Sequence, residues 1–151
     1  MLRWLKQRFG PHVIDDPVFG TIRCMKTPDP AKCYWEGSLN FTPVGSEVEV
    51  CVDGGPSGPD KEQRDLFQKI ASRWTEIHEK VSPILIKEYS SWRQPDQPEK
   101  AEFTLGLISV PLDELPHMEW DLTFEYGADH DHIFVVQMKG WAPTGQVSID
   151  G

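Results

Sequence analysis

Glu47-Val-Glu-Val-Cys-Val-Asp53 is the stretch that decides the fold, because valine occupies every second position in it. An alternation of period two is typical of a β-strand that has one buried face and one face in water. Immediately afterwards, Gly54-Gly-Pro-Ser-Gly-Pro59 ends the alternation, and the apolar period becomes helical from Lys61. The chain therefore passes here from a half-buried strand, through a short connector, into an amphipathic helix.

The helix that follows this connector has one apolar stripe. Residues three or four positions apart form it: Leu66, Ile70, Trp74, Ile77, Val81 and Ile84 or Leu85. Asp60 or Ser57 is placed to cap its start. We expect Pro83 to bend the helix or to divide it, with a second helix beginning there, because proline lacks an amide donor and clashes with the preceding turn.

Alternating segments on both sides of the helix predict the other strands. They cover residues 18–25, 33–41 and 47–53 before the helix and 102–109, 117–126 and 132–138 after it, with 147–149 as a short addition. Short turns between successive strands favour antiparallel pairing. The expected fold class is α+β, an antiparallel sheet of about six strands with the helix packed on one face, in the order βββ-α-βββ.

The length of 151 residues corresponds to a single domain, which we expect to span residues 1–151. Residues 1–15 are expected to form a short helix that docks Trp4, Leu5 and Phe9. This segment lacks the continuous apolar stretch of a secretory signal. No apolar run approaches the ~18 residues of a membrane span. We therefore expect no membrane span and a cytoplasmic location.

The charge is strongly acidic, with 24 Asp and Glu against 15 Lys and Arg. Phosphate binding needs concentrated basic residues, so nucleic acid is not an expected partner. The predicted strands place acidic residues together on the sheet face away from the helix: Glu36, Glu47, Glu49, Asp53, Glu119, Asp121 and Glu125. Such a face would steer a basic protein towards it. The alternative to a basic partner is a second copy of the chain, which would form a homodimer through the same face.

Six tryptophans are numerous for this length. Trp35, Trp74 and Trp120 fall at inward positions and are expected in the core. Trp92 and Trp141 lie beside loops, and exposed tryptophans are enriched at interaction sites. The residues predicted to bind a partner are therefore Trp92, Trp141, Glu47, Glu49, Glu119 and Asp121.

The densest polar cluster is Asp129-His-Asp-His132, which spans the end of a predicted turn over residues 127–131 and the first residue of the next strand. Imidazole and carboxylate groups are good ligands for divalent metals. The candidate metal ligands are Asp129, His130, Asp131 and His132, with His78 and His117 as additional donors. Their spacing matches no established metal motif, and a hairpin turn also favours Asp for its backbone geometry. A metal-binding protein or metal-dependent hydrolase is thus the alternative function.

Motifs of catalysis are missing from the sequence. There is no Gly-x-Ser-x-Gly, no His-Glu-x-x-His and no Cys-x-x-Cys among Cys24, Cys33 and Cys51. We therefore expect a non-enzymatic protein without a cofactor. A small-ligand domain with an aromatic pocket between helix and sheet is a third hypothesis.

Three stretches resemble a bacterial family of unknown function. They are Asp16-Pro-Val-Phe-Gly20, Tyr34-Trp-Glu-Gly37 and Gly58-Pro-Asp-Lys-Glu-Gln-Arg64. The resemblance covers residues 1–92 best, is looser beyond residue 100, and implies a bacterial origin but no catalytic residue. Small acidic α+β proteins also include immunity proteins that neutralise secreted toxins. By this analogy of size, charge and fold, the expected function is a protein-binding, immunity-like domain.

Overall fold

The computed structural model describes residues 12–29, 33–92, 102–112, 117–127 and 129–151, which form one eight-stranded sheet and two helices. The first strands are β1 (Val13–Asp16), β2 (Gly20–Met25), β3 (Tyr34–Phe41) and β4 (Ser46–Asp53). The helices α2 (Lys61–Ser72) and α3 (Trp74–Trp92) follow. The remaining strands are β5 (Phe103–Val110), β6 (Glu119–Tyr126), β7 (Asp129–Lys139) and β8 (Ala142–Asp150).

The strands lie side by side in chain order from β1 to β8. All neighbours are antiparallel except β4 and β5, which run parallel because the two helices carry the chain back along the sheet between them. The predicted α+β class with a mainly antiparallel sheet is confirmed. The expectations of fewer strands and of antiparallel pairing throughout are wrong.

Two of the strands differ most from the sequence-based expectation. Val13–Asp16 form β1, although residues 13–15 were expected within an N-terminal helix. β1 pairs with residues 20–23 of β2. β8 covers Ala142–Asp150 and not only residues 147–149. Pro143 and Gly145 in β8 conceal its alternation, since both residues are rare in strands. The rest of the expected N-terminal helix, residues 1–11, lies outside the described residues.

The sequence predicted a break in the helical region at Pro83, and this prediction is wrong. The break falls at Arg73. Arg73 ends α2 with φ −102° and ψ 10°, and α3 begins at the next residue. Pro83 lies inside α3. Because Pro83 and Glu79 are both exposed, the carbonyl group that loses its donor is close to water. At the other end, Asp60 caps α2 by accepting a hydrogen bond from the Gln63 amide at 2.8 Å.

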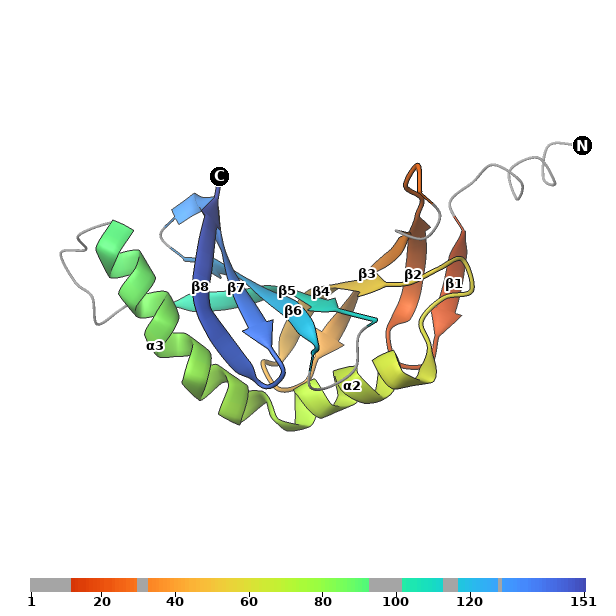
Figure 1. Cartoon of the computed structure of the whole chain (residues 1–151), viewed down its shortest axis with the longest axis horizontal. Coiled ribbons are helices and arrows are strands. Elements are labelled where there is room, and N and C mark those ends of the chain that lie inside the picture. Colours follow the sequence, from red (N-terminus) through yellow and green to blue (C-terminus); the bar gives the residue numbers. More distant parts are fainter. Residues whose placement is uncertain (1–11, 30–32, 93–101, 113–116, 128) are drawn as a thin grey trace, which may run out of the picture.

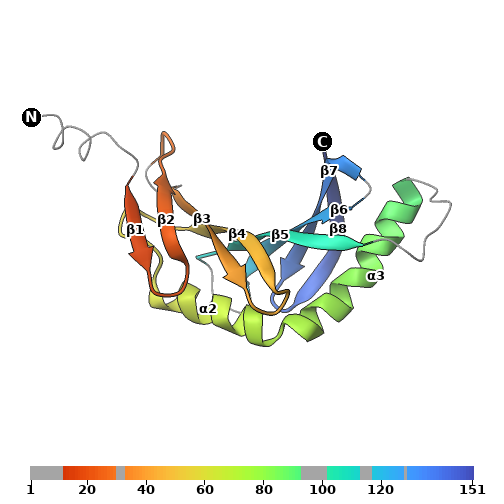
Figure 2. The ribbon, with the colours of Figure 1, turned by 180° about the vertical axis from the view of Figure 1, so that it is seen from behind.

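The sheet is curved into a trough. β1 and β2 rise on one side, β7 and β8 rise on the other, and α2 and α3 run along the convex side (Figure 1). Figure 2 shows the same arrangement from behind. The bend between the helices follows this curvature, which lets both helices stay against the sheet. The face away from the helices is therefore concave.

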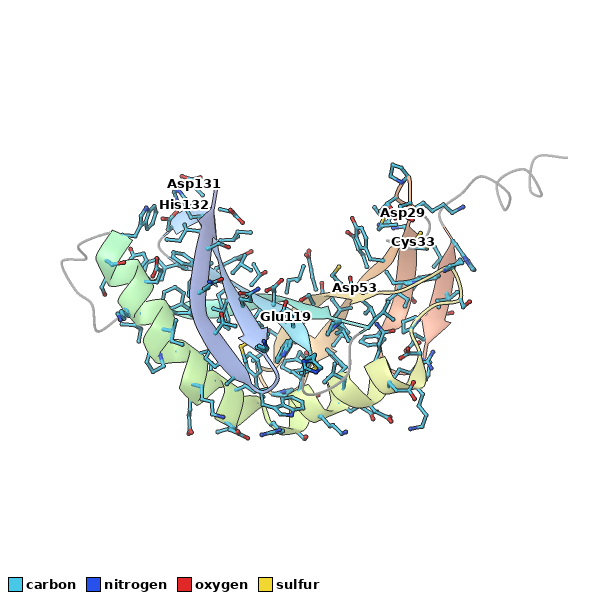
Figure 3. The ribbon with its side chains drawn as sticks, viewed as in Figure 1. Asp29, Cys33, Asp53, Glu119, Asp131 and His132 are labelled. Carbon is cyan, nitrogen blue, oxygen red and sulfur yellow. The ribbon has the colours of Figure 1, made fainter. Side chains whose placement is uncertain are left out.

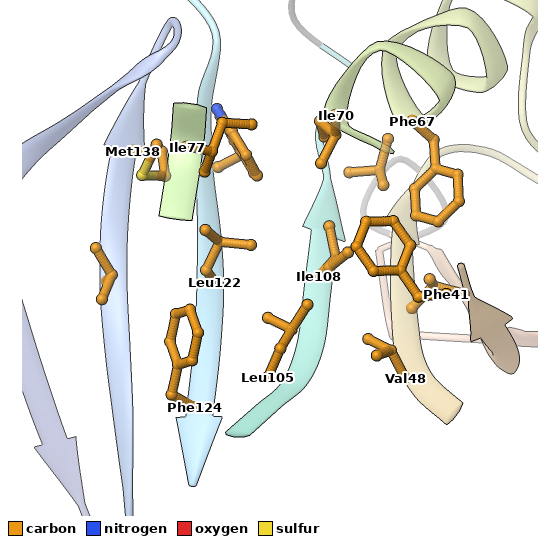
Figure 4. Close-up of a cluster of buried hydrophobic side chains, with 14 of the residues drawn as sticks. Phe41, Val48, Phe67, Ile70, Ile77, Leu105, Ile108, Leu122, Phe124 and Met138 are labelled. Atoms are coloured by element: carbon orange, nitrogen blue, oxygen red, sulfur yellow. The ribbon is translucent and has the colours of Figure 1, made fainter. Parts of the chain in front are cut away.

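The core lies between the convex face of the sheet and the helices (Figure 4). Val48, Val50 and Val52 of β4 are at most 1% exposed, as the alternation predicted. Trp35, Trp74 and Trp120 are buried, as predicted. The helices bury Phe67, Ile70, Trp74, Ile77, Val81, Leu85 and Tyr89. Phe67 takes the place predicted for Leu66, which is only partly buried. Burying one such side chain fully contributes about 1.5–3 kcal/mol.

A β-bulge in β5 changes which residues face the core. The pairing of β5 with β6 shifts register between Leu105 and Leu107, at Gly106. Leu105 and Ile108 are consequently both buried in the core. Leu107 instead shares the concave face with its register partner Glu49. The alternation of residues 102–109 predicts that Phe103, Leu105 and Leu107 share one face, and the bulge makes this prediction wrong.

Candidate functional site: an acidic concave face

The four acidic residues predicted to bind a partner, Glu47, Glu49, Glu119 and Asp121, lie on the concave face of the sheet. On β4, Glu47, Glu49 and Asp53 alternate with the buried valines, and on β6 the acidic residues alternate with Trp120 and Leu122. The term acidic face is used here for seven residues: Glu36, Glu47, Glu49, Asp53, Glu119, Asp121 and Glu125. Figure 3 shows Asp53 and Glu119, from strands on either side of β5, between the two raised arms of the sheet.

The strand register brings these residues into rows that cross the sheet. Glu36 of β3 stands opposite Cys51 of β4, and Cys51 stands opposite Ser109 of β5. The Ser109 hydroxyl donates to the Asp121 carbonyl at 3.2 Å, and it accepts from the Asp121 amide at 2.7 Å. Glu36 and Asp121, which are distant in the sequence, thus belong to one row over the four central strands.

Positive charge is scarce beside these carboxylates. Arg23 of β2 stands opposite Glu36, and Lys139 of β7 stands opposite Glu119. Within the described part of the chain, no ion pair reaches the carboxylates of Glu36, Glu47, Glu49, Glu119, Asp121 or Glu125. On the helices, by contrast, acidic residues are paired, as Glu76 is with Arg73 and Lys80. The negative charge of the acidic face is therefore largely uncompensated.

Two titratable groups on this face respond to that charge. Burial, together with the carboxylates of Asp53 and Glu36, raises the pKa of the Cys51 thiol to about 11. The pKa of Asp121 is also raised, first by burial and then by the neighbouring charge of Glu119. Both groups become negative on losing a proton, and both burial and nearby negative charge oppose this.

A depression of about 440 Å³ lies in the acidic face over β2 to β5. Glu36 and Glu49 line it from two adjacent strands, and Leu107, turned outward by the bulge, contributes an apolar surface. Arg23 and Tyr34 complete the side nearest β2. The depression thus combines two carboxylates, an aliphatic group and an aromatic ring.

The two tryptophans predicted to bind a partner lie away from the acidic face. The guanidinium carbon of Arg73 lies 4.3 Å from the centre of the Trp141 ring, which also contacts Trp120. Trp141 therefore packs beside the junction of the helices. Trp92, at the end of α3, is 39% exposed, and its ring centre lies 4.6 Å from that of His132. The structure does not bring these rings together with the carboxylates predicted to act with them.

The Asp129–His132 segment forms the start of β7 and not only a turn. Asp129 is buried, and one of its carboxylate oxygens lies 2.9 Å from Nδ1 of His132 and accepts from the Asp131 amide at 3.1 Å. Asp131 is exposed, and the side chain of His130 lies outside the described part of the chain. Among the side chains that the structure does describe, no three metal-ligating groups come together.

The third hypothesis, a small-ligand pocket between helix and sheet, applies to a depression beside α3. A depression of about 540 Å³ lies between α3 and strands β5 and β6. Trp74, Phe103 and Phe124 line it with aromatic surface, and His78 and Glu79 contribute polar groups. His78 is also close to the Ser82 hydroxyl, at 3.2 Å.

Contacts among the three family-like stretches could not be predicted from the sequence. Nη2 of Arg64 lies 2.8 Å from a carboxylate oxygen of Asp16, and the other oxygen accepts from the amides of Val18 and Phe19. The Trp35 indole donates to the carbonyl of Gly55 at 3.0 Å. These contacts tie the start of α2 to the end of β1, and the connector before α2 to β3. The stretches therefore have a structural role in this chain.

No family model, curated protein or solved structure matches this chain. The described helices include none that is long and apolar enough to cross a membrane. A bacterial origin and a cytoplasmic location stay predictions.

Proposed function

We propose that this chain is a non-enzymatic protein-binding domain, and that its acidic face receives a basic surface of a partner protein. The observation that supports this most is the group of six concave-face carboxylates, those of Glu36, Glu47, Glu49, Glu119, Asp121 and Glu125, which form no ion pair within the described residues. Complementary charge chiefly accelerates association and excludes wrong partners. An immunity-like protein that neutralises a basic toxin domain would be one such domain.

The energetic cost of the acidic face also favours a role in binding. Like charges on neighbouring strands repel one another, and this repulsion reduces the stability of the folded chain. The raised pKa of Asp121 is one local result of burial and this repulsion. A surface that lowers stability is commonly kept because a function requires it.

The other hypotheses have less support. A metal site at Asp129–His132 would have to compete for a carboxylate that already contacts His132 and Asp131. A homodimer through the acidic face would bring two surfaces of the same charge together, which costs free energy of association.

A model polycation tests the proposal without knowledge of the partner. Binding of a fluorescein-labelled oligolysine peptide is measured by anisotropy for the wild type and for Glu47→Gln/Glu119→Gln/Glu125→Gln. We expect the triple variant to lose roughly tenfold in affinity, since each exposed ion pair contributes a few tenths of a kcal/mol to about 1 kcal/mol.

The matched control removes the same charge from the helices, in Glu62→Gln/Glu79→Gln/Glu88→Gln. We expect its affinity to stay within about twofold of the wild type, because screening weakens charges that lie beyond about 8 Å at physiological salt. Equal losses in the two variants, or no binding of the peptide by the wild type, would contradict the proposal.

A further inference from the structure

We infer that the depression between Glu36 and Glu49 is an anchor site for one arginine side chain of the basic partner. The inference rests on the proposed function and names the place and the chemistry of the central contact. Protein interfaces commonly depend on a few anchors in pockets, and arginine is enriched among them.

The spacing of Glu36 and Glu49 on the sheet suits a guanidinium group. Glu36 stands opposite Cys51, and Glu49 stands opposite Ser38, so the two glutamates are diagonal neighbours on adjacent strands. Such diagonal positions are roughly 7–8 Å apart. A guanidinium group has five N–H donors in one plane, so it can donate to carboxylates on two of its sides at once. A lysine ammonium is a single point of charge and fits one carboxylate better than two.

The rest of the lining suits the remainder of an arginine side chain. Leu107 faces the depression only because the bulge at Gly106 turns it away from the core. An aliphatic surface there can pack against the methylene groups of the guest. Tyr34 offers an aromatic ring, on which a guanidinium group stacks favourably.

The charges around the depression favour a cationic guest. Neither Glu36 nor Glu49 forms an ion pair within the described residues. The raised pKa of Cys51, to which Glu36 contributes, agrees with uncompensated negative charge at this place. Arg23 is the one cation of the lining, and it opposes a guest of the same sign. Its removal should therefore strengthen binding, whereas removal of the glutamates should weaken it.

The test compares oligoarginine and oligolysine peptides of equal length on two variants of equal charge. Glu36→Gln/Glu49→Gln changes the depression, and Glu47→Gln/Glu125→Gln changes the acidic face outside it. For oligoarginine we expect roughly a tenfold loss in the first variant and about a threefold loss in the second. For oligolysine we expect similar losses in both. Arg23→Gln should raise the affinity for oligoarginine.

A second experiment tests the apolar contact with Leu107. This contact does not depend on the net charge of the protein. Leu107→Ala keeps the net charge, and we expect it to lower the affinity for oligoarginine about threefold. The methyl resonances of Leu107 in the wild type should also shift on adding oligoarginine, and this reports the contact even where the variant folds poorly.

The possible failures are distinguishable. Equal losses in the two glutamate variants for oligoarginine, with no shift of the Leu107 methyl groups, would overturn the anchor site and leave the proposed function standing. A preference of the depression for oligolysine would overturn the assignment to arginine. Failure of the wild type to bind either peptide would overturn both proposals.

Discussion

At the scale of single residues, Cys51 reports the electrostatic potential of the acidic face. Only the thiolate reacts with iodoacetamide, and burial with the charges of Asp53 and Glu36 raises the thiol pKa to about 11. We expect alkylation of Cys51 to accelerate through pH 8 to 10 by about tenfold per unit, without reaching a plateau. Peptide mass spectrometry would distinguish alkylation of Cys51 from alkylation of Cys24 and Cys33, which are buried.

Substitution of one neighbouring charge gives the matched comparison for Cys51. Glu36→Gln removes a charge that raises the thiol pKa, so alkylation at pH 8 should become faster. Glu62→Gln removes a distant charge on α2 and should leave the rate unchanged. Equal rates in the wild type and the Glu36 variant would contradict the assignment of the pKa shift to this face.

Asp16 provides the second prediction at this scale. Burial alone would raise its pKa, but hydrogen bonds from Arg64 and from the amides of Phe19 and Val18 lower it below 3.8. A carboxyl group with a lowered pKa stabilises the fold above its unfolded pKa, and this contribution is lost as the pH falls through the folded pKa. We expect Asp16→Asn to cost about 1–3 kcal/mol at pH 7, as measured by urea unfolding.

The pH dependence distinguishes this ionic contribution from a packing effect. As the pH falls below 3.8, the unfolded wild type binds a proton at Asp16 before the folded protein does, so the difference in unfolding free energy between wild type and variant should shrink. A difference of constant size down to pH 2 would show that the carboxylate charge is not what stabilises the junction with α2.

At the scale of elements, the close pairing of β2 and β3 depends on Gly37. A Cβ atom there would lie 2.7 Å from Cγ2 of Ile22 and 2.9 Å from the backbone oxygen of Thr21. The backbone oxygen cannot move without disturbing the strand pair, so we expect Gly37→Ala to cost about 1–3 kcal/mol in unfolding free energy. Gly55→Ala is the control, because a Cβ atom there has no neighbour within 4 Å. Similar losses in the two variants would refute the argument.

Elements with strict periodicity could be predicted, and those governed by tertiary contacts could not. β4 and β6 alternate cleanly, so their buried and acidic faces followed from the sequence. The bulge at Gly106 is different, because a register shift depends on the partner strand β6. The helix break at Arg73 likewise follows the curvature of the sheet, which no local pattern of α2 or α3 encodes.

The same distinction applies to the candidate site. The sequence predicted the acidic face, because side chains alternate along each strand. It could not predict the depression, since that needs the register of four strands and the outward turn of Leu107. It also placed Trp92 and Trp141 with the carboxylates, whereas their ring contacts lie with His132 and Arg73.

At the scale of the whole molecule, the net charge of −9 predicts how salt affects stability. Repulsion within the acidic face destabilises the folded chain, and added ions screen it. We expect sodium chloride to raise the Tm of the wild type, and to raise that of Glu47→Gln/Glu119→Gln/Glu125→Gln by less. Differential scanning fluorimetry measures both, and an equal rise in the two proteins would show that the repulsion is not centred on this face.

The parallel pair of β4 and β5 has a consequence for how the chain acquires its structure. In each of the other strand pairs the two strands follow one another without an intervening helix, most of them through a short turn, whereas Glu49 and Leu107 come together across both helices. Closing so long a loop costs chain entropy before any contact offsets it, and contacts of high sequence separation slow folding. The two meanders, β1–β4 and β5–β8, can each begin to assemble locally. We therefore expect the formation of the β4–β5 seam, which supports the depression in the acidic face, to be the step that commits the chain to its native topology.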